Sequence, residues 1–168
     1  MFKIGDKVVH PQHGVGEIVK VANRAFGSGV KKEYYEISIP GGSTVWVPLD
    51  PPTFGLRKLA TKRMLTKCRK ILSSKPSPLP DDARVRQSEL ASRLKEGTIA
   101  AQCEVVRDLF AYGEHKSLYG TIANFFRTTQ DVLYQEWAII NKITVHEAAE
   151  EIGSLLDKSR QRVSKAKS

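Results

Sequence analysis

His146 and Glu147 begin a stretch with the spacing of a helical zinc-protease motif, in which two histidines four residues apart bind the metal. Glu150 occupies the position of the second histidine, so the paired imidazole ligands are missing. His10 and His13 flank a turn, but these two histidines have no clear third ligand. We therefore expect neither a metal site nor a cofactor.

Motifs for nucleotide and acyl chemistry are also missing. The sequence contains no G-x-x-x-x-G-K-[ST], G-x-G-x-x-G or G-x-S-x-G. Cys68 and Cys103 are widely spaced, which is typical of buried thiols in a reducing cytosol; a disulfide between them is the alternative. No signal peptide begins the chain, and no apolar run reaches the roughly 18 residues of a membrane span. We expect a non-enzymatic, monomeric cytoplasmic protein without a membrane or small-molecule partner.

Positive charge is unevenly distributed along the chain. The net charge of +9 is made up of +9 over residues 1–75, −5 over residues 76–157 and +5 over residues 158–168. A stretch without acidic residues holds eight cations: Arg57, Lys58, Lys62, Arg63, Lys67, Arg69, Lys70 and Lys75. Such a cluster indicates an anionic partner, either nucleic acid or an acidic protein surface. The alternative is a solvated helix face.

The N-terminal third has the pattern of short antiparallel strands. A β-branched run at residues 7–10 lies between two turns, and further strand-like runs follow at residues 15–22, 33–39 and 43–48. Residues 55–57 could add a closing strand. Four or five short strands in fewer than about sixty residues predict a small SH3-like or Tudor-like antiparallel barrel.

From about residue 59 the apolar period becomes helical. Apolar residues recur at helical spacing and lysines and arginines take the other faces: Met64, Cys68, Ile71 and Leu72 form the apolar set. We expect this amphipathic helix to pack on the barrel. Three prolines and three serines within residues 73–80 predict a stiff linker, so the first domain would cover residues 1–75.

Residues 81–157 are predicted to form a second domain of about four helices. Three of these helices have capping residues: Asp81 or Asp82, Thr98, and the Thr144 and Glu147 capping box. A long helix over residues 117–141 carries an aromatic stripe that could be a base-stacking platform, but we interpret it as core. The basic residues 158–168 predict a disordered tail. The fold class is therefore α+β, a barrel followed by an all-α domain.

The order of these motifs resembles a known family. Residues 5–16 (GDKVVHPQHGVG), 47–48 and 55–57 are similar to the CarD/CdnL family of bacterial transcription regulators, whose first domain is shared with transcription-repair coupling factor. Residues 104–109 and 143–148 are similar to its helical domain. The resemblance implies a Tudor-like domain that docks on the β subunit of RNA polymerase in the bacterial nucleoid. It also implies a helical domain that touches promoter DNA and favours the open complex.

The resemblance places polymerase contacts on two parts of the first domain. Arg24 matches an arginine of the family, and Trp46 lies on the strand that also carries Val45 and Val47, where some members have arginine. Tryptophan and arginine are both typical of interface hot spots. If Val45 and Val47 point into the core, alternation along the strand turns Trp46 outward. The alternative is that Trp46 faces the core.

The DNA-contacting residues match the family less closely. Its members have a wedge tryptophan at the start of the first helix after the linker, and Ala83 takes that position. Arg84 and Arg86 beside it could hold phosphates, with Arg93 on the same helix. The surrounding domain is net acidic.

The sequence therefore predicts a transcription regulator that docks on polymerase and modulates open-complex formation. One version adds phosphate contacts from the helical domain and tail, and another occupies polymerase without gripping DNA. The third alternative is a free-standing nucleic-acid-binding barrel that uses residues 57–75.

Overall fold

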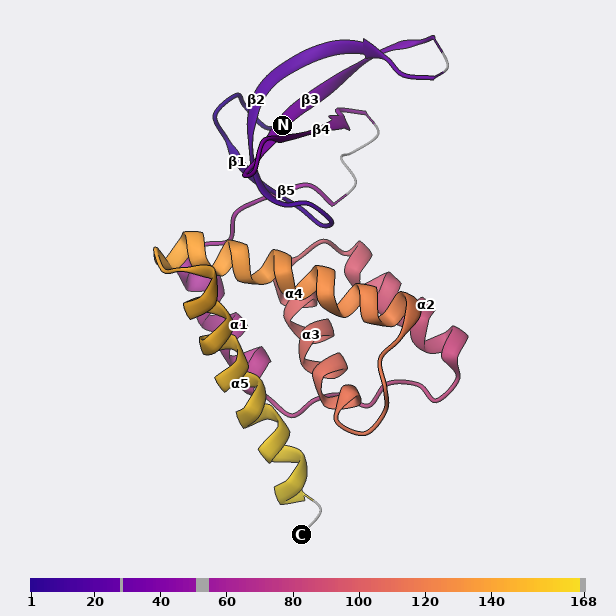
Figure 1. Cartoon of the computed structure of the whole chain (residues 1–168), viewed down its shortest axis with the longest axis vertical. Coiled ribbons are helices and arrows are strands. Elements are labelled where there is room, and N and C mark those ends of the chain that lie inside the picture. The colour runs from indigo at the N-terminus through magenta and orange to yellow at the C-terminus, as the bar shows by residue number, and fades with distance from the viewer. Residues whose placement is uncertain (28, 51–54, 167–168) are drawn as a thin grey trace. The chain divides into compact units, whose positions relative to one another are not determined.

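The computed structural model describes residues 1–27, 29–50 and 55–166, with side chains as far as residue 163. The chain divides into two compact units, Met1–Leu59 and Ala60–Ser168. The first is an antiparallel sheet and the second is helical, which confirms the α+β prediction. Figure 1 shows the two units with their elements labelled.

The sheet unit has five antiparallel strands in the order β4-β3-β2-β1-β5. They are β1 Lys7–His10, β2 Gly14–Ala25, β3 Lys31–Ile39, β4 Ser43–Pro48 and β5 Arg57–Lys58. The four predicted strands and the possible closing strand are all present, although β2 and β3 are longer than expected. Within the described residues, β4 pairs only with β3 and β5 only with β1, so the sheet is open and not a closed barrel.

One face of the sheet carries the core of this unit. Its buried members come from four strands and the approach to β5: Val8, Ile18, Tyr35, Ile37, Val47 and Leu56. Gly16 lies where β2 crosses this core, and an added Cβ would stand 2.5 Å from Ile37 Cγ2 and 2.8 Å from the Ser38 carbonyl oxygen. Glycine is therefore required at position 16 of β2 for close packing, because even a methyl group would displace the backbone of the neighbouring strand.

The helical unit consists of α1 Lys62–Ser73, α2 Ala83–Lys95, α3 Ile99–Gly113, α4 Gly120–Asn141 and α5 Val145–Ala166. The predicted caps are confirmed. Asp82 accepts from the N–H groups of Arg84 and Val85, and Thr98 accepts from Ala101. Thr144 and Glu147 exchange hydrogen bonds of 2.8 and 3.0 Å as a capping box. None of the described helices is long and apolar enough to cross a membrane.

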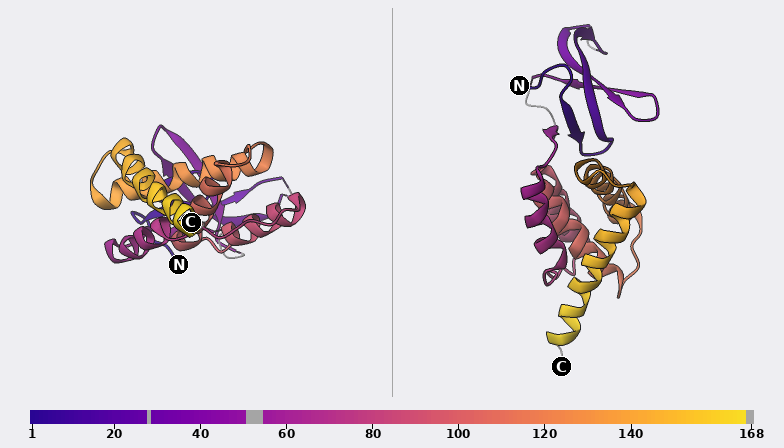
Figure 2. Two further views of the ribbon diagram at one scale, coloured as in Figure 1. Left: turned by 90° about the horizontal axis from the view of Figure 1, so that it is seen from below. Right: turned by 90° about the vertical axis from the view of Figure 1, so that its left-hand side faces the viewer.

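The position of α1 corrects the predicted domain boundary at residue 75. This helix lies beside α3 and α5 (Figure 2), and it buries Leu65, Cys68 and Leu72 in the core of the helical unit. Met64, expected on the apolar face, is 43% exposed, and Leu65 takes the inward position. Cys68 and Cys103 are both buried and form no disulfide, so the disulfide alternative is wrong.

Residues 74–80 pack on the helical unit and do not link two domains. The guanidinium of Arg107 donates to the Ser74 hydroxyl at 2.8 Å, and the Ser77 N–H donates to Asp108 Oδ1 at 2.9 Å. Pro76 is buried. Their partners lie about thirty residues further along the chain, which is why the Pro/Ser composition alone resembled a linker.

The expected disordered tail is also corrected, since α5 continues to Ala166. The Ser159 hydroxyl is buried and donates to the Ser74 carbonyl at 2.6 Å. Arg160 pairs with Glu114 at 3.1 Å and with Asp157 at 3.3 Å. These contacts hold a segment whose lysine, arginine and alanine residues favour a helix. Residues 167 and 168 of the predicted tail lie outside the described residues.

The aromatic stripe of α4 is core, as predicted, and not a base-stacking platform. Trp137 is fully buried, and its indole N–H donates to Glu151 Oε2 at 2.9 Å. The Arg69 guanidinium stacks 5.1 Å from the Trp137 ring and donates to Glu151 Oε1 at 2.7 Å. Burial disfavours the ionised form of Glu151, but these two hydrogen bonds outweigh it and hold its pKa below the usual value. This group fastens α1 to α4 and α5.

Replacing Asp108 by alanine tests the buried ionic group of the helical unit. The carboxylate is fully buried and accepts from Arg93 at 2.7 Å and from Arg107 at 2.8 Å. Its loss removes the buried carboxylate that the two guanidinium groups share, so we expect the free energy of unfolding to fall by about 3–5 kcal/mol. Urea unfolding followed by far-ultraviolet circular dichroism measures it. Arg160→Ala, which removes exposed ion pairs, should cost less than about 1 kcal/mol; equal effects would contradict the prediction.

Candidate functional site

Arg24 and Trp46 meet on the face of the sheet opposite its core. The Arg24 guanidinium carbon lies 4.4 Å from the centroid of the Trp46 ring, a cation–π contact. Trp46 is opposite Glu36 in the register of β3 and β4, whereas Val45 and Val47 pack in the core. Trp46 therefore points away from the core, as the alternation predicts. The structure brings together two residues that lie on different strands.

Two aromatic residues that the sequence analysis missed extend this pair. Phe26 is 50% exposed, and its ring centroid lies 5.0 Å from that of Tyr34 and 6.3 Å from that of Trp46. Phe26 follows Arg24 by two residues and Tyr34 precedes Glu36 by two, so strand alternation could have found both. We call Arg24, Phe26, Tyr34 and Trp46 the aromatic face. An exposed aromatic group beside an arginine has the composition of an interface centre.

Val45 and Val47 cannot contribute side chains to that face, because both point toward the core. Their backbone groups are directed at β3, because the Leu49 N–H donates to the Glu33 carbonyl and such hydrogen-bonded pairs recur at every second residue of β4. Among the described residues β4 pairs on one side only, so its other side presents the N–H and C=O groups of Thr44 and Trp46. This edge, next to Trp46, could accept a strand from another protein.

The predicted DNA-contacting residues separate into exposed and occupied groups. Ala83 and Arg84 are exposed at the first turn of α2, where the Asp82 cap fixes the helix start. Arg86 is buried: its Nη1 donates to the carbonyls of Pro80 and Asp81 at 2.9 Å, and the guanidinium stacks 5.0 Å from the Tyr112 ring. Arg86 therefore holds the chain leading into α2, and its guanidinium is occupied by these contacts.

Arg93 is similarly occupied. It binds Asp108 at 2.7 Å and also Glu89, four residues earlier on the same helix. Both acceptors are carboxylates, so little charge is left for a phosphate. Of the four residues predicted to contact DNA, the structure leaves Ala83 and Arg84 accessible, and a shallow groove runs from Arg84 along α2 to Ser92.

The histidines do not form a metal site. Among the described residues, no group of three or more histidine, cysteine, aspartate or glutamate side chains could hold a metal ion. His146 instead faces Glu150 at 3.3 Å on the exposed side of α5. His10 Nδ1 accepts from the backbone N–H groups of Gln12 and His13 at 3.1 and 3.3 Å, which closes the β1–β2 turn. Burial, with a smaller contribution from neighbouring His13, lowers the pKa of His10 to about 4.

Comparison with known proteins assigns both units. Residues 2–59 match the CarD-like/TRCF RID domain, and residues 67–153 match the CarD C-terminal domain. The chain belongs to the CarD family. It is 27% identical over 146 residues to "Putative transcription factor YdeB" of Bacillus subtilis (strain 168), an alignment that covers 86% of this chain and 95% of that protein.

Membership of the CarD family accounts for the architecture and excludes an enzyme. CarD-family transcription factors are non-enzymatic, in agreement with the absence of catalytic motifs in the sequence. The sheet unit is the RNA polymerase-interacting domain, so the chain is a CarD-like regulator of transcription that interacts with polymerase. The aromatic face and the free edge of β4 lie within that matched domain.

Protonation of His10, which closes the turn between β1 and β2, should destabilise the sheet unit in acid. Because folding lowers the pKa of His10 from 6.5 to about 4, the unfolded chain binds more protons between these values. Stability should therefore rise with pH from about 4 to 6.5 and then level off. Histidine ring chemical shifts followed by NMR should show His10 titrating near pH 4.

His10→Gln provides the control for that titration, since glutamine does not ionise. It should remove the part of the pH dependence of thermal stability that belongs to His10. A His10 ring that titrates near 6.5 in the folded protein would contradict the prediction.

Proposed function

We propose that the sheet unit docks on the β subunit of RNA polymerase through the aromatic face, and that the protein thereby modulates open-complex formation at promoters. The observation that carries this proposal is the Arg24–Trp46 contact at 4.4 Å beside the half-exposed Phe26. These ring contacts hold an amphipathic surface in place before a partner arrives. A preorganised anchor loses little conformational entropy on binding.

The edge of β4 supplies the second part of the docking surface. A polymerase strand that added to this edge would bond to the backbone of Thr44 and Trp46, while the Trp46 side chain would flank it on one face. Backbone hydrogen bonds provide affinity for any strand. The aromatic face would then distinguish the correct strand from others.

The second candidate activity is a phosphate contact at the start of α2, within the matched CarD C-terminal domain. Arg84 is exposed there, and the Asp82 cap fixes the turn that carries it. Ala83 is too small to act as a wedge between base pairs. The contact we propose is therefore to the promoter backbone, without unstacking.

Truncating Trp46 tests docking. Trp46→Ala and Arg24→Glu should each weaken binding to the isolated β lobe of polymerase by about 30-fold or more, because hot-spot truncations cost about 2 kcal/mol. Biolayer interferometry measures the affinity. Tyr119→Ala is the matched control, since Tyr119 is an exposed aromatic residue of the helical unit and its loss should change nothing. Undiminished binding by both sheet variants would refute the proposal.

Replacing Arg84 should change the promoter footprint, whereas replacing Arg86 should change the stability of the protein. Arg84→Ala should reduce protection of the upstream edge of the melted region in a footprint of the polymerase–promoter complex, with an unchanged melting temperature. Arg86→Ala should lower the melting temperature, because it removes two buried hydrogen bonds to carbonyls. An unchanged footprint with Arg84→Ala would favour a module that occupies polymerase without gripping DNA.

A further inference from the structure

The solvent-exposed face of α1 carries three cations along its middle. The opposite face buries Leu65, Cys68 and Leu72 in the helical unit. At about 100° per residue, Arg63, Lys67 and Lys70 fall within roughly 60° of one another, directly opposite this buried face. All three are exposed, and none has an ion pair within the described residues. We call Arg63, Lys67 and Lys70 the basic stripe.

The remaining cations of α1 make this arrangement more distinctive. Arg69 points toward α5, where it pairs with Glu151 at 2.7 Å and stacks on Trp137. Glu151 thus neutralises Arg69, whereas no carboxylate within the described residues pairs with the three cations of the basic stripe. The helix holds five lysines and arginines and no acidic residue. Its outward charge therefore remains available to a partner.

The basic stripe is unfavourable for the isolated helix. Arg63 and Lys67 are four residues apart and Lys67 and Lys70 three apart, so like charges repel on the same face. Lys62 and Arg63 also lie in the first turn, at the positive end of the helix dipole, and the turn has no acidic residue. A face needed only for solubility would mix both signs. A bound anion would reduce both the repulsion between the cations and their unfavourable interaction with the helix dipole.

The spacing and composition of the stripe favour one anion. Arg63 and Lys70 are seven residues apart, about 10 Å along the helix. A DNA strand has one phosphate per roughly 3.4 Å of duplex axis, so the stripe spans about three phosphates. Because α1 has no aromatic residue, it offers no platform for the bases of a single strand. Lysine is depleted at the centres of protein interfaces, which disfavours an acidic protein surface.

We propose that the basic stripe is a sequence-independent binding site for the phosphate backbone of duplex DNA. The site is formed by Arg63, Lys67 and Lys70 and belongs to the helical unit. It differs from the aromatic face and from the start of α2. It does not require polymerase, so it stands or falls independently of the docking surface proposed above.

The test measures binding of the full chain to a short fluorescein-labelled duplex of arbitrary sequence by fluorescence anisotropy. Affinity is followed between about 50 and 200 mM NaCl for the wild type and for Arg63→Gln/Lys67→Gln/Lys70→Gln. Three lost phosphate contacts should lower the slope of log affinity against log salt by about 2.7. Across this range the wild type should therefore lose about 40-fold more affinity than the variant.

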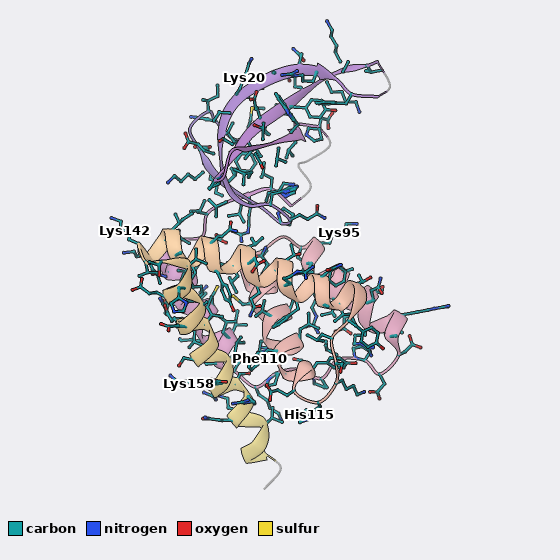
Figure 3. The ribbon with its side chains drawn as sticks, in the orientation of Figure 1. Lys20, Lys95, Phe110, His115, Lys142 and Lys158 are labelled. Atoms are coloured by element: carbon teal, nitrogen blue, oxygen red, sulfur yellow. The ribbon has the colours of Figure 1, made fainter. Side chains whose placement is uncertain are left out.

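A matched control removes three exposed cations that form no stripe. Lys95 ends α2, Arg127 lies on α4, and Lys142 lies at the turn between α4 and α5; Figure 3 shows Lys95 and Lys142 well apart. Replacing all three by glutamine makes the same change in net charge. The salt slope of this control should stay within one unit of the wild type. Trp46→Ala should not change the slope.

Several results would overturn the proposal. These are a wild type that does not bind duplex at about 50 mM salt, a slope unchanged in the stripe variant, or an equal loss in the control variant. Unchanged duplex binding together with weakened binding of DNA-free polymerase would identify an acidic protein surface as the partner instead. Circular dichroism melting checks that the stripe variant is folded. All three substitutions lie at exposed positions, so the melting temperature should not change.

Discussion

The buried carboxylate of Asp108 determines how the helical unit is assembled. It accepts from Arg93 of α2, from Arg107 of its own helix and from the backbone of Ser77. One side chain thus joins α2, α3 and the segment between α1 and α2. A buried charge is stable only with such partners. The path of residues 74–80, and with it the start of α2 where Arg84 is exposed, depends on this network.

Local patterns in the sequence were sufficient for most of the elements. Turn residues and β-branched runs predicted four strands and a possible fifth, and capping residues (Asp81 or Asp82, Thr98 and Thr144) marked three helix starts correctly. The domain boundary failed because a Pro/Ser segment has the same composition whether or not it packs. Arg107 and Asp108, which hold residues 74 and 77, are distant in the sequence. No local pattern records such a partner.

The candidate site shows the same division between local and distant information. Alternation placed Trp46 correctly on the outer face of β4, but its contact with Arg24 depends on the pairing of three strands. Arg86 and Arg93 have the composition of a phosphate site, yet carbonyls and carboxylates of the protein occupy them. A count of cations therefore overstates the charge offered to a partner. Burial decides which arginines hold the fold and which remain for binding.

The short connection between the two units has a consequence for how the protein acts. β5 ends at Lys58, and the Ala60 N–H donates to the buried Glu136 carboxylate at 2.8 Å, so Leu59 is the one residue between the sheet and the anchored start of the helical unit. A tether this short keeps the effective concentration of the second unit high wherever the first is bound. Weak contacts from the helices would then suffice, since each forms within a single assembly and avoids the entropic cost of a separate encounter.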